Sequence, residues 1–241
     1  MRHNQFVAAV ALSLLAITAA GAQDDHGRGR GRGRGDDQNH GNQVSQQEQQ
    51  RRIAEEQQRQ RDYQNHLNAQ LRTAQAQQAQ LQAQRHAAAL AQQQRYVDAL
   101  RQQQQRLQAQ RDIAHDPYIT APLTYRYRLN GASRQTTQYG ADVLRQSVNN
   151  GYSQGYQQGQ ADRADGLRSD YRRSFAYQDA NYGYNGAYVP QSDYNYYFRQ
   201  GFQRGYADGY ANQSRYGSFS NGSGNILSNI LNSILGLTTI H

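Results

Sequence analysis

The side chains that could carry acid–base, nucleophilic or metal chemistry are few in this 241-residue chain and lie far apart. There is no cysteine, which excludes a disulfide, a thiolate metal site and a cysteine nucleophile. No histidine occurs from residue 116 to residue 240, so a Ser–His–Asp arrangement is not expected in that half. His66 and His86 stand in a polar, helix-forming stretch, and we interpret them as surface side chains rather than zinc ligands.

Carboxylates are the other candidates for catalysis. Six aspartates of the second half could supply a pair for glycoside chemistry, namely Asp162, Asp165, Asp170, Asp179, Asp193 and Asp208. Asp170 and Asp193 are interpreted as helix caps, and Asp162 and Asp165 as surface charges beside arginines. The glycine-rich runs lack the lysine and the preceding buried strand of a nucleotide-binding loop. We therefore expect no catalytic residue, no metal site, no cofactor and no small-molecule substrate.

The first 22 residues have the organisation of a secretory signal peptide. A short basic start precedes an apolar run over residues 6–20, and Ala20-Gly21-Ala22 supplies the small residues for cleavage. The alternative is a membrane anchor, but about 15 apolar residues are fewer than the roughly 20 that a spanning helix needs. We expect an exported chain, periplasmic or extracellular, with no transmembrane span after cleavage.

Residues 23–44 are a predicted disordered linker rich in glycine and arginine. They hold almost no apolar side chain, so burial cannot offset the entropy of ordering. Four of their arginines alternate with glycine and are candidates for binding a polyanion: Arg28, Arg30, Arg32 and Arg34. The alternative is a solvated spacer whose charge is partly balanced by neighbouring aspartates.

Residues 45–116 predict one long helix. Gln, Ala, Arg and Leu dominate, Ser45 and Glu48 have the spacing of a capping box, and Pro117 marks the end. Two sets of apolar residues repeat every seven positions and would form alternative seams of a weak coiled coil. The first set is Ala69, Ala76, Ala83, Leu90 and Val97, with the companion row Leu100, Leu107 and Ala114. The second set is Leu67, Ala74, Leu81 and Ala88. One helix of this length, roughly 105 Å, would have to be a coiled coil, a packed hairpin or frayed. The alternatives are a solvated polar helix and a glutamine-rich, aggregation-prone tract.

Residues 117–217 predict a small helical module rich in glycine and tyrosine. Period-two alternation over residues 123–129 predicts a strand before the turn at Asn130-Gly131. Helices are expected over residues 141–165, 170–180 and 193–214. Glycines recur every four residues in the first and last of these, and each set forms a stripe on which another backbone can pack closely: Gly151, Gly155 and Gly159, then Gly201, Gly205 and Gly209. The alternative is a disordered, prion-like segment.

The second glycine stripe also carries a resemblance. Residues 201–210 read Gly-Phe-Gln-Arg-Gly-Tyr-Ala-Asp-Gly-Tyr, which resembles the G-F-x-x-G-Y-x-D-G-Y repeats of exported bacterial proteins of unknown function. The resemblance covers residues 139–217. The earlier copy departs from it, having Gln158 and Gln160 where Asp208 and Tyr210 stand. The resemblance implies no activity.

Residues 218–241 predict a flexible hinge, residues 221–224, followed by an amphipathic helix. Its apolar face is formed by six aliphatic residues that we expect to mediate association: Ile226, Leu227, Ile230, Leu231, Ile234 and Leu235. One interpretation is binding to a membrane surface or a partner. The other is docking onto the rest of the chain, which the absence of basic residues on the polar face favours.

These features predict a mainly α protein that is not an enzyme. All 26 basic residues are arginine, glutamine is the commonest residue with 40 copies, and the net charge is +8. The first hypothesis is an exported structural or interaction protein of a bacterial cell envelope, which associates with itself or an envelope component through helical packing. The alternative is a polyanion-binding protein that uses the Arg-rich linker and the interleaved Arg and Tyr residues at 125–128 and 171–173, with an anionic envelope polymer or a nucleic acid as partner.

Overall fold

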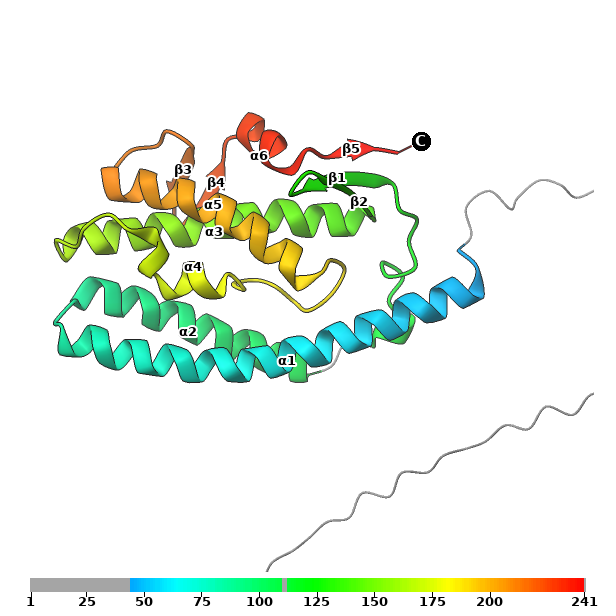
Figure 1. Cartoon of the computed structure of the whole chain (residues 1–241), viewed down its shortest axis with the longest axis horizontal. Helices are drawn as coiled ribbons and strands as arrows, with labels where there is room; N and C mark the ends of the chain where they lie inside the picture. The colour runs from blue at the N-terminus through cyan, green and yellow to red at the C-terminus, as the bar shows by residue number, and fades with distance from the viewer. Residues whose placement is uncertain (1–43, 110–111, 241) are drawn as a thin grey trace, which may run out of the picture. The chain divides into compact units, whose positions relative to one another are not determined.

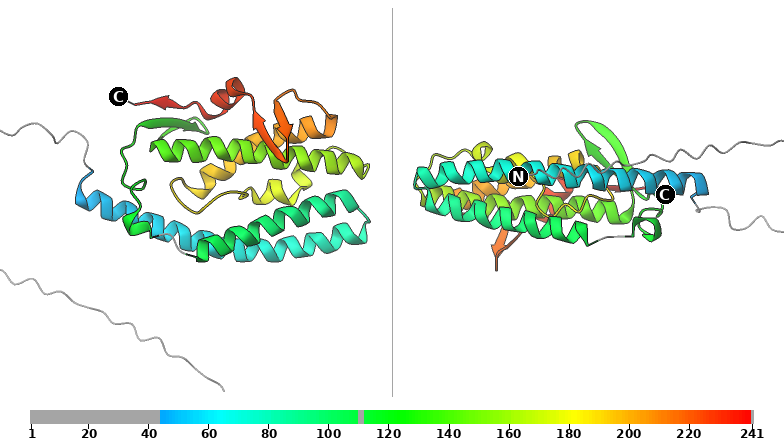
Figure 2. Two further views of the ribbon diagram at one scale, coloured as in Figure 1. Left: turned by 180° about the vertical axis from the view of Figure 1, so that it is seen from behind. Right: turned by 90° about the horizontal axis from the view of Figure 1, so that it is seen from below.

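Two helix pairs dominate the structure (Figure 1). The computed structural model describes residues 44–109 and 112–240, which belong to one compact unit. Helices α1 (Gln46–Ala83) and α2 (Ala87–Gln108) form a hairpin, and α3 (Gln138–Ala164) packs along α5 (Gln191–Ala211). The short α4 (Phe175–Asp179) lies between the two pairs in both side views (Figures 1 and 2). The expected mainly α fold is confirmed.

Residues 45–116 form the packed hairpin and not one continuous helix, because the chain turns back at residues 84–86. The α1 helix begins as expected, with the Ser45 hydroxyl accepting from the backbone N–H of Glu48 at 3.3 Å. It ends in a Schellman motif, in which Arg85 takes a positive φ of 61° and the His86 N–H bonds to the Leu81 carbonyl. The short η1 helix (Ile113–His115) follows α2.

A distant carboxylate caps the second helix of this hairpin. Asp165, at the end of α3, accepts from the backbone N–H groups of Ala88 and Ala89 at 3.1 and 2.8 Å. These are two of the N–H groups that an α-helix leaves without an internal partner at its start, and a negative charge is favoured there. The interpretation of Asp165 as a surface charge is therefore wrong, because it joins α3 to α2.

Each helix of the hairpin uses a different apolar row. On α1 the buried residues include Leu67 and Ala74, whereas Ala69 of the competing row is exposed. On α2 the buried residues include Val97 and Leu100 of that competing row. Both rows are thus used, one on each arm, and they face the same core because the chain folds back on itself.

Two β-hairpins turn at Asn-Gly. Strands β1 (Tyr125–Leu129) and β2 (Ala132–Thr136) pair antiparallel around Asn130-Gly131, where the strand was expected, and β5 (Thr238–Thr239) adds to β1. Strands β3 (Gly217–Ser220) and β4 (Ser223–Ile226) pair around Asn221 and Gly222, with φ of 51° and 78°. The flexible hinge expected at residues 221–224 is wrong, since Asn-Gly is the usual two-residue hairpin loop.

The expected helices of the second half lie close to the observed ones, with one exception. In place of a helix over residues 170–180, the structure has the 3₁₀ turn η2 (Tyr171–Arg173) and then α4. The last helix, α6 (Ser228–Leu235), starts two residues later than expected, because Ile226 belongs to β4.

Tyrosine predominates among the largest side chains of the core. In the described part of the chain, seven of the twelve largest fully buried side chains are tyrosines: Tyr63, Tyr96, Tyr152, Tyr184, Tyr194, Tyr197 and Tyr206. A buried tyrosine fills space like phenylalanine but brings a hydroxyl that needs a hydrogen-bond partner. The location of those partners therefore determines the polar architecture of the interior.

Candidate functional site

All six glycines of the predicted stripes lie where α3 meets α5. Their positions pair in ascending order along both helices, so α3 and α5 run parallel. A Cβ added at Gly205 would lie 2.8 Å from the carbonyl carbon of Tyr152, and one added at Gly155 would lie 2.8 Å from the backbone nitrogen of Tyr206. Carbon atoms cannot approach a backbone so closely, so the contact requires glycine. Both stripes are therefore covered within one chain.

Two reciprocal tyrosine–aspartate pairs flank this glycine contact. The Tyr152 hydroxyl of α3 donates to Asp208 of α5 at 2.8 Å, and the Tyr206 hydroxyl of α5 donates to Asp162 of α3 at 2.7 Å. Asp208 also accepts from the backbone N–H groups of residues 215 and 216, and Asp162 accepts from the Gln158 amide. The interpretation of Asp162 as a surface charge is wrong, and burial raises the pKa of its carboxyl despite these hydrogen bonds.

Asp193 is buried and is not a helix cap. Helix α5 begins at Gln191 after Pro190, which places Asp193 in the first turn, facing inward with no exposed surface. Its carboxylate accepts from the Tyr127 hydroxyl at 2.6 Å and forms an ion pair with Arg134 at 2.7 Å. Asp193 therefore ties the β1–β2 hairpin to α5. Asp170 does act as a cap, accepting from the Arg172 N–H at 3.2 Å.

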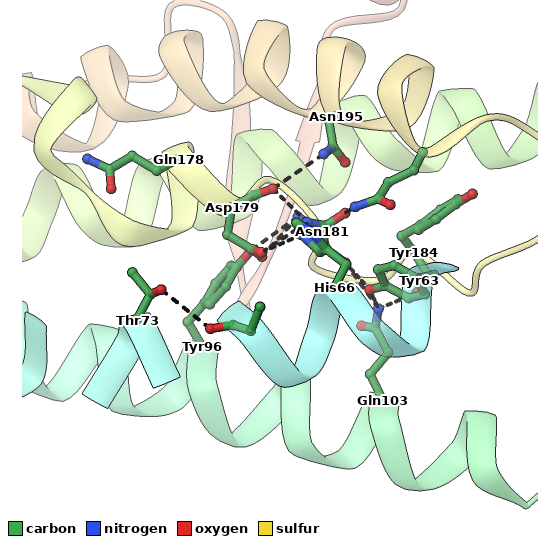
Figure 3. Close-up of polar contacts among 12 residues, drawn as sticks. Tyr63, His66, Thr73, Tyr96, Gln103, Gln178, Asp179, Asn181, Tyr184 and Asn195 are labelled. Carbon is green, nitrogen blue, oxygen red and sulfur yellow. Dashed lines mark hydrogen bonds and ion pairs between the residues drawn. The ribbon is translucent and has the colours of Figure 1, made fainter. Parts of the chain in front are cut away.

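A fourth buried aspartate organises a polar cluster between the hairpin and α4 (Figure 3). Asp179, which has a fully buried side chain, accepts from the Tyr96 hydroxyl at 2.6 Å and from the Asn181 backbone and amide at 3.1 and 2.9 Å. The His66 Nε2 lies 3.6 Å from the Asp179 carboxylate and 2.9 Å from the Asn181 amide. His66 was expected on the surface, yet its ring turns inward to this cluster.

Gln103 extends the cluster along α2. Its amide nitrogen bonds to the Tyr63 hydroxyl, to the Tyr184 carbonyl and, at 3.1 Å, to the Asn181 carbonyl (Figure 3). Burial raises the pKa of Tyr63 and of Tyr96, and the charge of Asp179 adds to the rise. The Tyr–Asp–His combination has the composition of an acid–base site. However, the Asp179 carboxylate is enclosed by its donors, and the cluster joins α1, α2 and α4.

The charged side chains divide between interior and surface by sign. Four aspartates and Glu56 are buried, whereas no arginine of the described segments is. Fifteen described arginines are exposed, against five exposed acidic residues. Twelve of these fifteen form no ion pair within the described segments: Arg61, Arg72, Arg85, Arg95, Arg106, Arg126, Arg128, Arg163, Arg168, Arg172, Arg173 and Arg215.

The six C-terminal aliphatic residues are only partly available for association. Ile226 and Leu235 are buried against the rest of the chain. Ile230, Leu231 and Ile234 are half-buried, and only Leu227, at 46%, is exposed. The α6 helix therefore docks on its own chain and leaves a narrow apolar edge.

The remaining expectations concern the N-terminal segments, metal sites and membrane spans. The signal peptide and Arg28, Arg30, Arg32 and Arg34 lie outside the described residues. Within residues 44–109 and 112–240, no group of three or more His, Asp or Glu side chains could hold a metal ion. No helix of the same segments is long and apolar enough to cross a membrane.

Comparison with known proteins gives no match: no family model, no curated protein and no solved structure matches this chain. The buried aspartates escaped sequence interpretation because their tyrosine partners lie 44 to 83 positions away. The one available signal was the number of tyrosines, 19, in a chain with few aliphatic residues to form a core.

Proposed function

We propose that this chain is a non-enzymatic, exported interaction protein of a bacterial cell envelope that binds an anionic polymer through its arginine-rich surface. The observation that carries the proposal is the division of charge, with 15 exposed arginines against five exposed acids among the described residues. An arginine without an acidic neighbour keeps its full charge for a partner. Its planar guanidinium also binds carboxylate, sulfate and phosphate groups with two parallel hydrogen bonds.

Aromatic rings hold two of these arginines in place. The guanidinium of Arg172 lies 5.4 Å from the ring centre of Tyr171, and that of Arg215 lies 5.1 Å from the ring centre of Tyr216. Such cation–π contacts reduce the freedom that an arginine loses when it binds, and they leave its N–H groups free to donate.

The state of the buried carboxylates supports a function other than catalysis. Each of the four buried aspartates accepts a tyrosine hydroxyl and at least one further donor. A general acid or base needs a free path to a substrate proton. The hydrogen bonds of these carboxylates instead join helices and strands. The proposal of export depends on residues 1–22, outside the described segments.

A second candidate is a structural protein that self-associates through α6. Leu227 is exposed beside the half-buried Ile230, Leu231 and Ile234, which form an uncharged edge. Apolar surface of this kind favours contact with another protein.

Salt-dependent binding to a defined polyanion tests the proposal. Binding of the full chain to fluorescent dextran sulfate is measured by anisotropy, and neutral dextran of equal length is the control. The logarithm of the affinity should fall linearly with the logarithm of salt concentration between about 50 and about 200 mM, with no binding to neutral dextran. Salt-independent binding, or equal binding of both polymers, would contradict the proposal. A mass that rises with concentration in sedimentation and falls for Leu227→Asp would favour the second candidate.

A further inference from the structure

A cavity of about 290 Å³ lies where the turn of the α1–α2 hairpin meets the segment between α3 and α4. The last turns of α1, the start of α2, the end of α3 and residues 167–178 line it. Its volume is near the lower end of the range for small-molecule sites, so it suits a single ring rather than an extended ligand.

The cavity wall contains a buried hydroxyl without a partner. Ser174 is 7% exposed, and its Oγ has no hydrogen-bond partner in the described segments. A buried polar group left unpaired is destabilising, and natural proteins keep few of them. The Ser174 hydroxyl therefore has a hydrogen-bonding capacity that no described residue uses.

The free charged groups at this cavity are cationic. Arg168 and Arg173 line it and form no ion pair or side-chain hydrogen bond with described residues, although the charge of Arg173 acts on Asp162. The two acids of the wall already have donors: Asp162 accepts from Tyr206 and Gln158, and Asp170 from a backbone N–H. The site therefore offers guanidinium groups to a ligand carboxylate.

Glutamine amides supply the rest of the polar lining. Gln80 and Gln84 make no side-chain hydrogen bond within the described segments, and Gln93 donates to the Ala74 carbonyl but keeps its amide oxygen free. Each free amide presents a donor and an acceptor, as a ring hydroxyl does. Phe175, Leu81 and Leu167 add an apolar wall that suits the face of a sugar ring.

We infer that this cavity binds a sugar acid, a ring that carries several hydroxyls and one carboxylate, as a unit of the anionic polymer. The carboxylate contacts Arg168 and Arg173, and the hydroxyls contact Ser174 and the glutamine amides. This inference rests on the proposed function, since it names the chemical class of the polymer's units.

Calorimetric titration of the full chain with glucuronate tests the inference, with glucose and inorganic phosphate as matched probes. Glucuronate should bind saturably, and glucose, which lacks the carboxylate, should bind about 10-fold more weakly or not at all. Arg173→Gln should weaken glucuronate binding by about 10-fold or more, whereas Arg163→Gln, which removes the same charge outside the cavity wall, should leave it unchanged. Absence of saturation, equal binding of phosphate, or equal effects of both variants would overturn the inference.

Ser174→Ala separates binding from folding. Because the hydroxyl has no partner among the described residues, its removal should keep or raise the melting temperature while weakening glucuronate binding. A lower melting temperature with unchanged binding would show that the hydroxyl serves the fold, and would overturn its role here. Dextran sulfate binding without glucuronate binding would overturn the cavity site alone. Glucuronate binding without dextran sulfate binding would overturn the proposal that the arginine-rich surface binds a polymer, and would leave the cavity site standing.

Discussion

Gly205→Ala probes the tightest feature of the fold, the contact of α3 and α5. The new Cβ would lie 2.8 Å from the carbonyl carbon and 2.9 Å from the Cα of Tyr152, and closer still to its carbonyl oxygen. These are backbone atoms, so they cannot rotate away and the helices must separate. Overpacking of a core typically costs about 1–3 kcal/mol, and separation would also weaken the Tyr152–Asp208 bond. We expect a loss of about 2–3 kcal/mol, which lowers the melting temperature by roughly 4–12 °C in a domain of this size.

Helix propensity acts in the opposite direction, which makes the sign of the effect decisive. Alanine is about 1 kcal/mol better than glycine in a helix interior, so a solvent-facing Gly205 would give a more stable variant. Ala207→Gly, at an exposed position of the same helix, calibrates that term and should destabilise by about 1 kcal/mol. Both variants are compared with the parent by urea unfolding followed by circular dichroism. A Gly205→Ala variant as stable as the parent, or more so, would refute the close contact.

Three further predictions concern the buried polar groups. Burial raises the pKa of eight tyrosines above 10, so in alkali these side chains should ionise only as the protein unfolds. The expected signal is a late, cooperative step in tyrosinate absorbance, and a single smooth titration near pH 10 would contradict this prediction. Burial raises the pKa of Glu56 above its ordinary 4.5, so the unfolded chain loses this proton at a lower pH than the folded chain. The stability of the parent relative to Glu56→Gln, measured by urea unfolding, should therefore fall from about pH 4 to about pH 7. A rise of this stability difference between the two pH values would contradict the raised pKa. Asp165→Ala removes the cap of α2 and should destabilise the fold by about 1 kcal/mol. Asp142→Ala, which breaks only surface contacts with Arg145 and Gln138, should change thermal stability by less than about 0.5 kcal/mol, and equal effects of the two variants would argue against the cap.

Local patterns predicted helices and one hairpin because the information for them is local. The four-residue spacing of glycine and the start signal at Ser45 each depend on residues within one or two turns. The Asn-Gly pair at residues 221–222 shows the limit of such interpretation. The same dipeptide predicted a turn at residues 130–131, yet the surrounding serines and glycines made residues 221–224 resemble a linker.

The break in the long helix was not predictable from its own residues. Residues 84–86 are Gln-Arg-His, without the glycine or proline that usually ends a helix, and Arg85 adopts a left-handed conformation that arginine rarely takes. The compensation is Asp165, which caps α2 from 76 and 77 positions away. Likewise, Asp193 resembled a cap by spacing, but its partners Tyr127 and Arg134 come from a hairpin about 60 residues earlier.

The central claim is that unpaired surface arginines bind an anionic polymer, and two double variants of equal charge test it most directly. Arg126→Gln with Arg128→Gln removes two exposed arginines that have no ion pair in the described segments. Arg51→Gln with Arg101→Gln removes two that are paired with Glu48 and Asp98. We expect the first variant to weaken dextran sulfate binding more and to reduce its salt dependence by up to about two released counterions. Equal weakening by both variants would mean that net charge alone governs binding, and unchanged binding in both would contradict the claim.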